Sequence, residues 1–528
     1  MTGRNDFQHI PMKDIYDVVI VGSGASGGTM AAHLARAGVN VLILEGGPRI
    51  DTRTDFNTHA LPSQFATRSI PIMKPGKAGF DSPRSYGMGG KTLLWNAVAL
   101  RMSERDLKGA TREGVGADWP FGYAEIEPYY SMIEKEIGIC GNRDGLPDMP
   151  DGEFMPPASL KCSDEILKRG AERIGVKLIH VRKATLTQFT NSRPACHYCG
   201  NCMAGCDVVA KYNSADVHIY PAERETGRID IRHNSIVNEL VVEEGRPRVR
   251  EVRYFDRQSG EPGSVRCRTV VLGCACEQTI ALLLMSKSPQ FASGLGNNSG
   301  QVGRHFIPHI TCAVDGFLKD LIGVPSVNDE GFLDHSYIPS FMHDRPRDYP
   351  RSFAIQVGFH NRRFAPWASK IKGIGAAYKK AVRDRYPAYM QLAGFMEMTP
   401  NPDSYVDLDP EAKDQYGLPK VRTHWKLSDA DQRRWNDMKK WCDSIMESSG
   451  AELLGTATKP ETNHELGGCK MGDDPRTSVV DGHCRAHEVD NLYVVDGSVF
   501  PNASEKNPTL TIMAVSARAA NHIAKTLS

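Results

Sequence analysis

Tyr16 to Gly28 reads YDVVIVGSGASGG, and this stretch decides the fold. Asp17 to Val21 predicts a short buried strand, and the alanine-rich segment Met30 to Ala37 predicts a helix. Three glycines separate the two elements: Gly22, Gly24 and Gly27. In that order they permit a tight turn, a close approach of the backbone to a pyrophosphate, and close packing of the helix on the strand. Because the N-terminus of a helix attracts phosphate, we expect a nucleotide here.

A second strand and an acid complete the unit. Val41 to Leu44 is apolar and ends at Glu45, about 20 residues after the glycines, where a carboxylate can accept hydrogen bonds from a ribose diol. The other interpretation of the glycines is an ordinary turn between strand and helix. The strand, helix and acid together favour dinucleotide binding, but they do not distinguish NAD from FAD.

Size and composition exclude several classes of protein. A chain of 528 residues predicts two domains, and 40% hydrophobic with 24% charged residues is typical of a globular protein. The 64 basic and 63 acidic residues leave no excess charge for binding nucleic acid. The longest strongly apolar run, Ile280 to Met285, is too short to span a bilayer. The first residues, MTGRNDFQHIPMKD, lack the features of an export signal.

Further along the chain, Tyr86 to Thr92 forms a second glycine-rich turn, and Ala97 to Leu100 predicts a strand. Thr269 to Gly273 predicts a buried strand that enters a helix near Glu277. Residues 311–455 read as irregular and are rich in aromatic side chains. We expect this region to be a substrate-facing domain inserted between nucleotide-binding segments.

The C-terminal region carries candidate catalytic residues. His464 lies in the stretch HELGGCKMG, and a predicted strand ends at Asp496 and Gly497. Asn507-Pro508-Thr509 then precedes a helix from Leu510 to about Thr526. An Asp-Gly turn followed by a helix can place a carboxylate and a helix N-terminus beside a bound cofactor.

Four cysteines lie within eleven residues and have the spacing C-x2-C-x2-C-x3-C: Cys196, Cys199, Cys202 and Cys206. Four thiolates this close together in a glycine-containing loop favour an iron-sulfur cluster. Structural zinc usually uses two cysteine pairs that are further apart, but zinc, a disulfide and free thiols remain alternatives. Asp207 stands where bacterial ferredoxins have a proline after the fourth cysteine.

These features together resemble the glucose-methanol-choline (GMC) oxidoreductases over essentially the whole chain. The resemblance is strongest to the catalytic subunits of bacterial FAD-dependent sugar dehydrogenases, such as glucose dehydrogenase and glucoside 3-dehydrogenase. It implies an α/β fold in which a Rossmann-like FAD-binding domain contains an inserted substrate-binding domain. The implied FAD-binding domain comprises residues 14–107, 213–310 and 460–528. The substrate-binding domain comprises 108–212 and 311–459, with the cysteine loop at 193–207.

The resemblance also assigns residues to FAD. Gly22, Gly24, Gly27 and Glu45 would hold its ADP half, Asp496 and Gly497 would lie along the ribityl and pyrophosphate groups, and Val237 would meet the adenine through its backbone. The remaining implied contacts are Gly89, Gly90, Trp95, Asn96, Asn507 and Thr509. The sequence departs from the family after Gly90, where many members have an asparagine and this chain reads Leu94-Trp95-Asn96.

His464 matches the catalytic histidine of the family, and Asn507 matches the second active-site position. A neutral imidazole can accept the hydroxyl proton of an alcohol while hydride leaves carbon for flavin N5. Asn507 can donate an amide hydrogen to the same oxygen. In the resembling subgroup a 3Fe-4S cluster occupies the cysteine region. Cys196, Cys202 and Cys206 fall at the spacing of its ligands, and Cys199 would be a fourth ligand of a 4Fe-4S cluster or a buried thiol.

The sequence therefore predicts an FAD-dependent dehydrogenase that oxidises a hydroxyl of a sugar or glycoside. Electrons would pass through the cluster, with 3Fe-4S favoured over 4Fe-4S, to an external acceptor such as a cytochrome, and a small accessory subunit is expected. The alternative is an oxygen-using sugar oxidase, a pyranose or glycoside 3-oxidase, with structural cysteines. Location is left open between the cytoplasm and a periplasm reached by co-export with a signal-bearing subunit.

Overall fold

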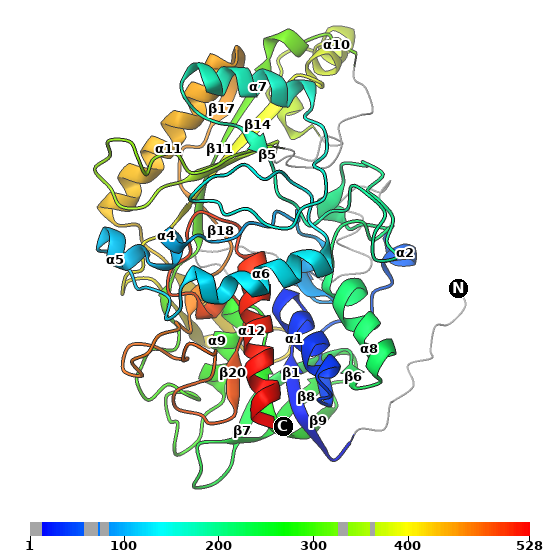
Figure 1. Cartoon of the computed structure of the whole chain (residues 1–528), viewed down its shortest axis with the longest axis vertical. Helices are drawn as coiled ribbons and strands as arrows, with labels where there is room; N and C mark the ends of the chain where they lie inside the picture. Colours follow the sequence, from blue (N-terminus) through cyan, green and yellow to red (C-terminus); the bar gives the residue numbers. More distant parts are fainter. Residues whose placement is uncertain (1–12, 57–71, 74–83, 326–335, 359–364, 528) are drawn as a thin grey trace.

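A computed structural model describes residues 13–56, 72–73, 84–325, 336–358 and 365–527. The polar, proline-containing stretch between Glu45 and Pro83, for which the sequence predicts loops, lies mostly outside these residues. Within the described residues, the chain forms two large sheets with helices packed on them, a smaller sheet of four strands and a two-stranded ribbon (Figure 1).

The first large sheet contains the dinucleotide-binding unit predicted from the sequence. Its strands, in spatial order, are β6 (Ile229–Arg232), β2 (Val41–Leu44), β1 (Ile15–Val21), β9 (Pro262–Leu272), β8 (Val249–Asp256) and β7 (Ser235–Val242), and β20 (Leu492–Val494) pairs with the end of β9. The strands β6, β2, β1, β9 and β20 are parallel, whereas β8 pairs antiparallel with both β9 and β7. Buried parallel strands read as continuous apolar runs, which is why β1 and β2 were visible in the sequence.

The order of the strands reverses between β1 and β9. The helix α1 (Ala25–Arg36) follows β1, and the chain continues to β2 on one side. The helix α9 (Cys276–Met285) follows β9, whereas β20 lies on the other side. Such a reversal opens a crevice at the carboxyl ends of the parallel strands, where open α/β sheets bind ligands.

The second large sheet has the order β17 (Ala451–Thr456), β11 (His309–Leu318), β14 (Tyr389–Glu397), β13 (Ala354–Val357), β12 (Ser336–Ile338) and β5 (Ile179–His180). A short strand, β18 (Glu461–Asn463), also pairs with β11. The helix α11 (Asp429–Ser448) covers one face, where Ile310 and Val314 share a buried core with Trp435 and Met438. Figure 1 shows α11 and α7 (Cys162–Arg173) at the end of the molecule opposite the first sheet.

The sequence interpretation of residues 311–455 as irregular was wrong, because this region supplies most of the second sheet and α11. All nine residues of β14 are buried, so both of its faces are covered and the alternation of a half-exposed strand is missing. Two strands that the sequence predicts are also shorter than expected. The stretch Val176 to Val181, which reads as a strand after the helix at Ser163 to Ile174, contributes only β5, and Ala97 to Leu100 contributes an isolated bridge between Val98 and Lys183.

The remaining elements connect these layers. The smaller sheet contains β16 (Pro419–His424), β15 (Tyr405–Lys413), β10 (Arg304–Phe306) and β19 (Gly467–Gly468), and β3 (Ile72–Met73) pairs with β4 (Arg84–Ser85). The other α-helices are α2 (Thr52–Asp55), α4 (Glu104–Leu107), α5 (Gly109–Glu113), α6 (Tyr123–Ile137), α8 (Tyr220–Thr226), α10 (Gly375–Arg385) and α12 (Thr509–Leu527). Single turns are η1 (Gly90–Leu93), η2 (Cys202–Ala204), η3 (Ala215–Ile219), η4 (Lys319–Leu321), η5 (Pro366–Lys370) and η6 (Gly497–Val499).

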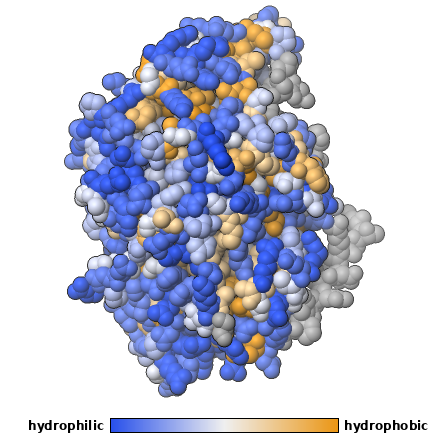
Figure 2. Space-filling view, viewed as in Figure 1, coloured by the Kyte–Doolittle hydropathy of each residue, from blue (hydrophilic) through white to orange (hydrophobic). Residues whose placement is uncertain are grey.

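On the face that Figure 2 shows, hydrophilic residues predominate, and apolar residues lie between them, mostly in the upper half. In the part of the chain that the structure describes, no helix has both the length and the apolar character needed to cross a bilayer.

Candidate active site and cofactor cleft

A cavity of about 370 Å³ lies at the carboxyl ends of β1, β2 and β9. It is the crevice expected at the strand-order reversal. Ten of the residues assigned from the sequence line it: Gly22, Gly24, Glu45, Gly90, Trp95, Val237, His464, Asp496, Gly497 and Thr509. Segments more than 400 residues apart in the chain thus meet around one space.

Three helices begin at this cavity. Ala25 and Ser26 of α1, Cys276 and Glu277 of α9, and Thr509 of α12 all line it. The first N–H groups of a helix lack partners within the helix, and the helix dipole adds partial positive charge there. The cavity therefore fits an anionic group such as a pyrophosphate.

The glycines of the first turn have the geometry that such a site needs. A Cβ atom on Gly27 would lie 2.0 Å from the carbonyl oxygen of Gly22, so only glycine lets α1 begin this close to the turn. Gly22 has a φ of +93°, and a Cβ there would lie 2.6 Å from the carbonyl oxygen of Gly273. At Gly24, by contrast, an added Cβ would meet no atom within 4 Å. Its backbone is therefore open to a ligand in the cavity.

Among the buried carboxylates of the cavity wall, Glu45 and Asp496 are held by short hydrogen bonds. Glu45 accepts hydrogen bonds from the hydroxyl and backbone N–H of Ser23 at 2.5 and 3.2 Å, and from the backbone of Gly47 at 2.9 Å. Asp496 accepts from Thr279 of α9 at 2.5 Å and from the Ser498 hydroxyl at 2.6 Å. Burial raises the pKa of both carboxyl groups, and these hydrogen bonds oppose that rise. They also fix the direction in which each carboxylate faces the cavity.

Four assigned residues do not line the cavity: Gly27, Gly89, Asn96 and Asn507. Gly27 acts through packing, and Gly89 adopts a φ of +107° in the second glycine-rich turn, where its N–H donates to the Ser23 hydroxyl at 2.9 Å. Asn96 faces away and accepts a hydrogen bond from Lys183 at 3.0 Å. Its neighbour Trp95 does line the cavity and donates its indole N–H to the carbonyl of Tyr212 at 2.8 Å.

His464 follows β18 and turns toward the cavity. Its backbone φ of +50° lies in the left-handed region, which is uncommon for a residue other than glycine, and the Asn463 side chain accepts its N–H at 2.8 Å. The ring of Phe395 stacks on the imidazole, with centroids 5.7 Å apart and an interplanar angle of 28°. These contacts hold a side chain that is otherwise free to rotate.

The environment of His464 keeps its imidazole neutral. Burial lowers its pKa to about 4, and Glu465 opposes this shift while Lys91 adds to it. Lys91 and Glu465 form an ion pair at 2.8 Å and also line the cavity. At neutral pH, His464 thus has an unprotonated nitrogen that can accept a proton.

Two residues that the sequence did not reveal contact the expected catalytic pair. Nδ1 of His309 lies 2.9 Å from Nδ1 of His464, and the Gln356 amide donates to Oδ1 of Asn507 at 2.7 Å. Both come from the second sheet, so their positions depend on strand pairing that has no local signal. Other lining residues that were missed are Cys274, Ala275, Glu277 and Tyr416. The predicted strand from Thr269 into a helix near Glu277 was the available signal for the first three.

The four clustered cysteines lie in a separate loop. Cys202 is buried in η2, and Cys196, Cys199 and Cys206 are partly buried. Burial raises the pKa of the Cys196 thiol, and the thiols of Cys199, Cys202 and Cys206 raise it further. The four thiols are therefore close enough to interact electrostatically. Among the described residues, however, no group of three or more His, Cys, Asp or Glu side chains is arranged to bind a metal ion. As placed, the thiols do not fit a cluster.

Lys211 connects this loop to the cavity wall. Its amino group is buried and donates to the carbonyl oxygens of Leu93, Trp95 and Cys202 at 2.9, 3.0 and 2.6 Å. Burial lowers the pKa of Lys211 to about 8. The amino group of Lys211 thus links the backbone of Trp95, which lines the cavity, to the backbone of Cys202.

The fold and the cleft define a dinucleotide-binding protein with a histidine in its cavity. The sequence profile of the GMC oxidoreductases matches residues 16–311 and 400–516, and the chain belongs to this family. Members bind FAD and act on CH–OH groups, which the cleft described above fits. The expected mixed α/β fold is thereby confirmed.

Relatives of known activity align over nearly the whole chain. Paromamine 6'-oxidase of Streptomyces fradiae is 28% identical, over 97% of this chain and 91% of that protein. The fructose dehydrogenase large subunit of Gluconobacter japonicus is 27% identical, over 96% and 97%. The gluconate 2-dehydrogenase flavoprotein of Pantoea cypripedii is 26% identical, over 94% and 92%. Both oxidases and dehydrogenases are therefore similar to this chain.

Among solved structures, pyridoxine 4-oxidase from Mesorbium loti has a TM-score of 0.69 at 17% identity and covers 96% of this chain and 99% of its own. Formate oxidase of Aspergillus oryzae has a TM-score of 0.67 at 14% identity, over 98% and 100%. These structures show that the fold is shared.

The glycine geometry predicts opposite effects for two matched substitutions. Gly27→Ala should destabilise the protein by about 1–3 kcal/mol, because its Cβ overlaps the Gly22 carbonyl. Gly24→Ala should leave the folded state intact but weaken FAD retention, because its Cβ enters the open space. Thermal unfolding and the ratio of flavin to protein absorbance measure the two effects. Normal flavin content in Gly24→Ala would contradict the assignment of that space to the cofactor.

Proposed function

We propose that this protein is an FAD-dependent dehydrogenase that oxidises a hydroxyl group of a sugar or glycoside. The proposal rests on the placement of His464. Its neutral imidazole lies in the wall of the cleft, where Phe395 and Asn463 hold it. Membership in the GMC family supports the reaction class, and relatives named for fructose, gluconate and paromamine support a polyhydroxylated substrate.

In the proposed reaction, the unprotonated ring nitrogen of His464 accepts the proton of the substrate hydroxyl. A flavin bound in the cleft would supply the two-electron acceptor for the hydride that leaves the carbon. Asn507 donates its amide N–H to the same oxygen and holds the carbon in position. The product is a carbonyl compound, and the proton stays on His464 until solvent removes it.

We further propose that the electron acceptor is an external carrier such as a cytochrome and that a small accessory subunit takes part. The cysteine spacing is the sequence feature behind the external carrier, and a relative named as a large subunit supports the accessory chain. An iron-sulfur cluster, 3Fe-4S rather than 4Fe-4S, is the part of the proposal that rests on spacing alone. Metal binding would have to draw the thiols together, as it does in other metal sites that form on binding.

Anaerobic mixing with sugars, glycosides and sugar acids should bleach the flavin absorbance for at least one substrate. His464→Asn, which keeps a polar side chain but not the imidazole, should slow this reduction about 100-fold or more, since general base catalysis contributes that much. Stopped-flow absorbance measures the rate. Full-speed bleaching in the variant would remove His464 from the reaction. Rapid peroxide formation in air without an added acceptor would favour the oxidase alternative.

The rate constant for flavin reduction should stay nearly level as pH falls from about 8 to 5, because a pKa near 4 keeps His464 neutral there. Below about pH 4 it should fall tenfold per unit, as the protonated ring can accept no proton. The unfolded histidine has a pKa near 6.5, so the His464 contribution to stability is present above that pH and is lost as pH falls toward 4. Circular dichroism at each pH separates unfolding from loss of rate. A decline already at pH 6.5 would contradict the lowered pKa.

Purified protein should contain about three iron atoms and acid-labile sulfide per chain if the cysteine proposal holds. Cys202→Ser should remove the iron without removing the flavin, because the loop is separate from the cavity lining. Metal analysis and electron paramagnetic resonance measure this. Flavin without iron in freshly prepared anaerobic protein would end the cluster proposal and leave the flavin chemistry untouched.

A further inference from the structure

The second sheet presents His309 and Gln356 on one face, directly behind the proposed catalytic pair. His309 pairs with Glu397 and Gln356 pairs with Ala393 across β14, and alternate residues of a strand share a face. Both side chains are buried, with exposed fractions of 0% and 2%. Each makes its hydrogen bond to one member of the pair, His309 to His464 and Gln356 to Asn507.

The contact between His309 and His464 limits which ring nitrogens can carry a proton. The two Nδ1 atoms are 2.9 Å apart, so one must carry a proton and the other must accept it. If His309 donates, the proton of neutral His464 resides on Nε2, and His464 has no ring nitrogen left to act as a base. If His464 donates, its Nε2 is bare and available. The direction of this one hydrogen bond therefore decides whether His464 can accept a proton.

The surroundings of His309 favour the second arrangement. Nε2 of His309 is buried without a well-directed hydrogen bond among the described residues, and the adjacent backbone groups of Ala503 and Ser504 raise the pKa of the ring, although burial lowers it overall. Groups that favour the protonated ring are carbonyl oxygens, which attract an N–H and repel a bare nitrogen. A proton on Nε2 of His309 leaves its Nδ1 free to accept from His464.

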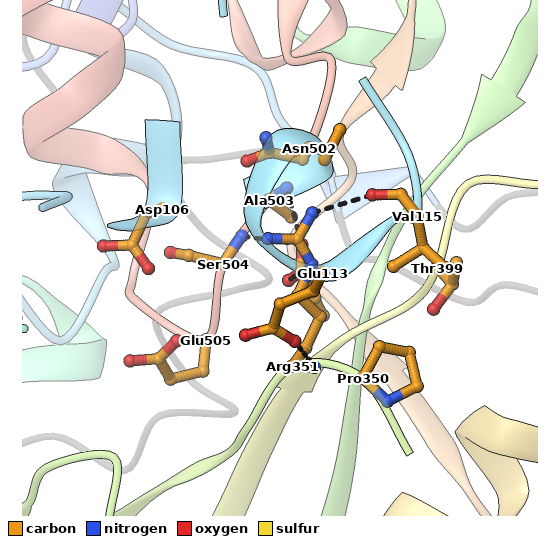
Figure 3. Close-up of polar contacts among 12 residues, drawn as sticks. Asp106, Glu113, Val115, Pro350, Arg351, Thr399, Asn502, Ala503, Ser504 and Glu505 are labelled. Carbon is orange, nitrogen blue, oxygen red and sulfur yellow. Dashed lines mark hydrogen bonds and ion pairs between the residues drawn. The ribbon is translucent and has the colours of Figure 1, made fainter. Parts of the chain in front are cut away.

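A buried ion pair holds that backbone in place. Glu397 accepts the N–H groups of Ala503 and Ser504 at 3.1 and 3.0 Å, and Nε of Arg351 lies 3.2 Å from the other carboxylate oxygen. Figure 3 shows the side chain of Arg351 between Ser504 and Val115, with Glu113 beside the Arg351 backbone. Arg351 donates to the carbonyl of Val115 at 3.0 Å and its backbone N–H donates to Glu113. The loop behind His309 is thus fixed by charged groups that are themselves paired.

Gln356 sets the orientation of the Asn507 amide group. An amide has one acceptor oxygen and one donor nitrogen, and the Gln356 N–H group occupies the Asn507 oxygen at 2.7 Å. The amide nitrogen of Asn507 is then the group that remains to bond a substrate oxygen. A carboxylate at position 356 would attract that nitrogen instead and would turn the Asn507 oxygen toward the substrate.

We propose that His309 and Gln356 are positioning residues that fix the hydrogen-bond polarity of the active site, making His464 a proton acceptor and Asn507 a donor. The inference rests on the proposed function, because it assigns direction to the two groups named there. An orienting partner that holds a base in the correct tautomer is a known requirement of catalytic histidines. Here a histidine and an amide from one sheet would serve both groups.

Nitrogen-15 NMR of histidine-labelled holoenzyme near pH 7 tests the first half without any substrate. The resonances of His464 are assigned by their absence in His464→Asn. In the native protein we expect His464 to carry its proton on Nδ1 and to have a bare Nε2. In His309→Leu the Nε2–H tautomer of His464 should appear. In His309→Gln the native tautomer should return, because the amide oxygen can accept a hydrogen bond from Nδ1. Native His464 with a protonated Nε2 and bare Nδ1 would overturn the proposal.

Polarity reversal at position 356 tests the second half in flavin reduction. Gln356→Glu should slow flavin reduction about 100-fold, because the introduced carboxylate binds the amide nitrogen of Asn507 and removes this donor from the substrate. Gln356→Leu should have a smaller effect, because it only leaves the Asn507 amide free to rotate. The defect should shrink at lower pH, because the introduced carboxyl group regains a donor when it is protonated. Gln432→Glu, which removes the same kind of amide hydrogen bond to an asparagine at an exposed position of α11, is the control and should reduce at the native rate. Equal effects of the Glu and Leu substitutions at all pH values would overturn this half, whereas a native enzyme that no substrate bleaches would instead count against the proposed function.

Discussion

The contact between the ends of β1 and β9 is the constraint on which the cleft depends. A Cβ on Gly22 would lie 2.6 Å from the Gly273 carbonyl, and one on Gly27 would lie 2.0 Å from the Gly22 carbonyl. Because no side chain stands between them, the two parallel strands end side by side and α1 and α9 begin at the same crevice. Two helix N-termini can then act on one anionic group, which neither could do as strongly alone.

The second sheet has an apolar face against α11 and a polar face toward the proposed catalytic residues. Ile310 and Val314 pack against Trp435 and Met438 of α11, so the neighbouring residues of the same strands must face the cleft. His309, Gln356 and Phe395 are on that face. The apolar core thus determines the position of polar side chains that contribute nothing to it, and a one-residue slip of β11 would exchange the two sets.

The buried charges have two different consequences. Asp496 and Glu45 are held by hydrogen bonds from their neighbours and give the cleft fixed acceptors. Glu397 and Arg351 lie outside the cavity lining and instead hold the loop that carries Ser504. Leaving one member of such a buried pair without its partner costs several kcal/mol, so the loop and the sheet are fixed together.

The sequence by itself determined the dinucleotide-binding unit, the family and the candidates His464 and Asn507, because local glycine patterns, apolar runs and short motifs are encoded in neighbouring residues. It also contained the cysteine spacing, although the thiols of the described residues are not arranged to bind a metal ion. Only the tertiary structure revealed His309, Gln356 and the order within residues 311–455. These depend on which strands pair and on which face is buried against α11, and such long-range pairing leaves no local pattern in the chain.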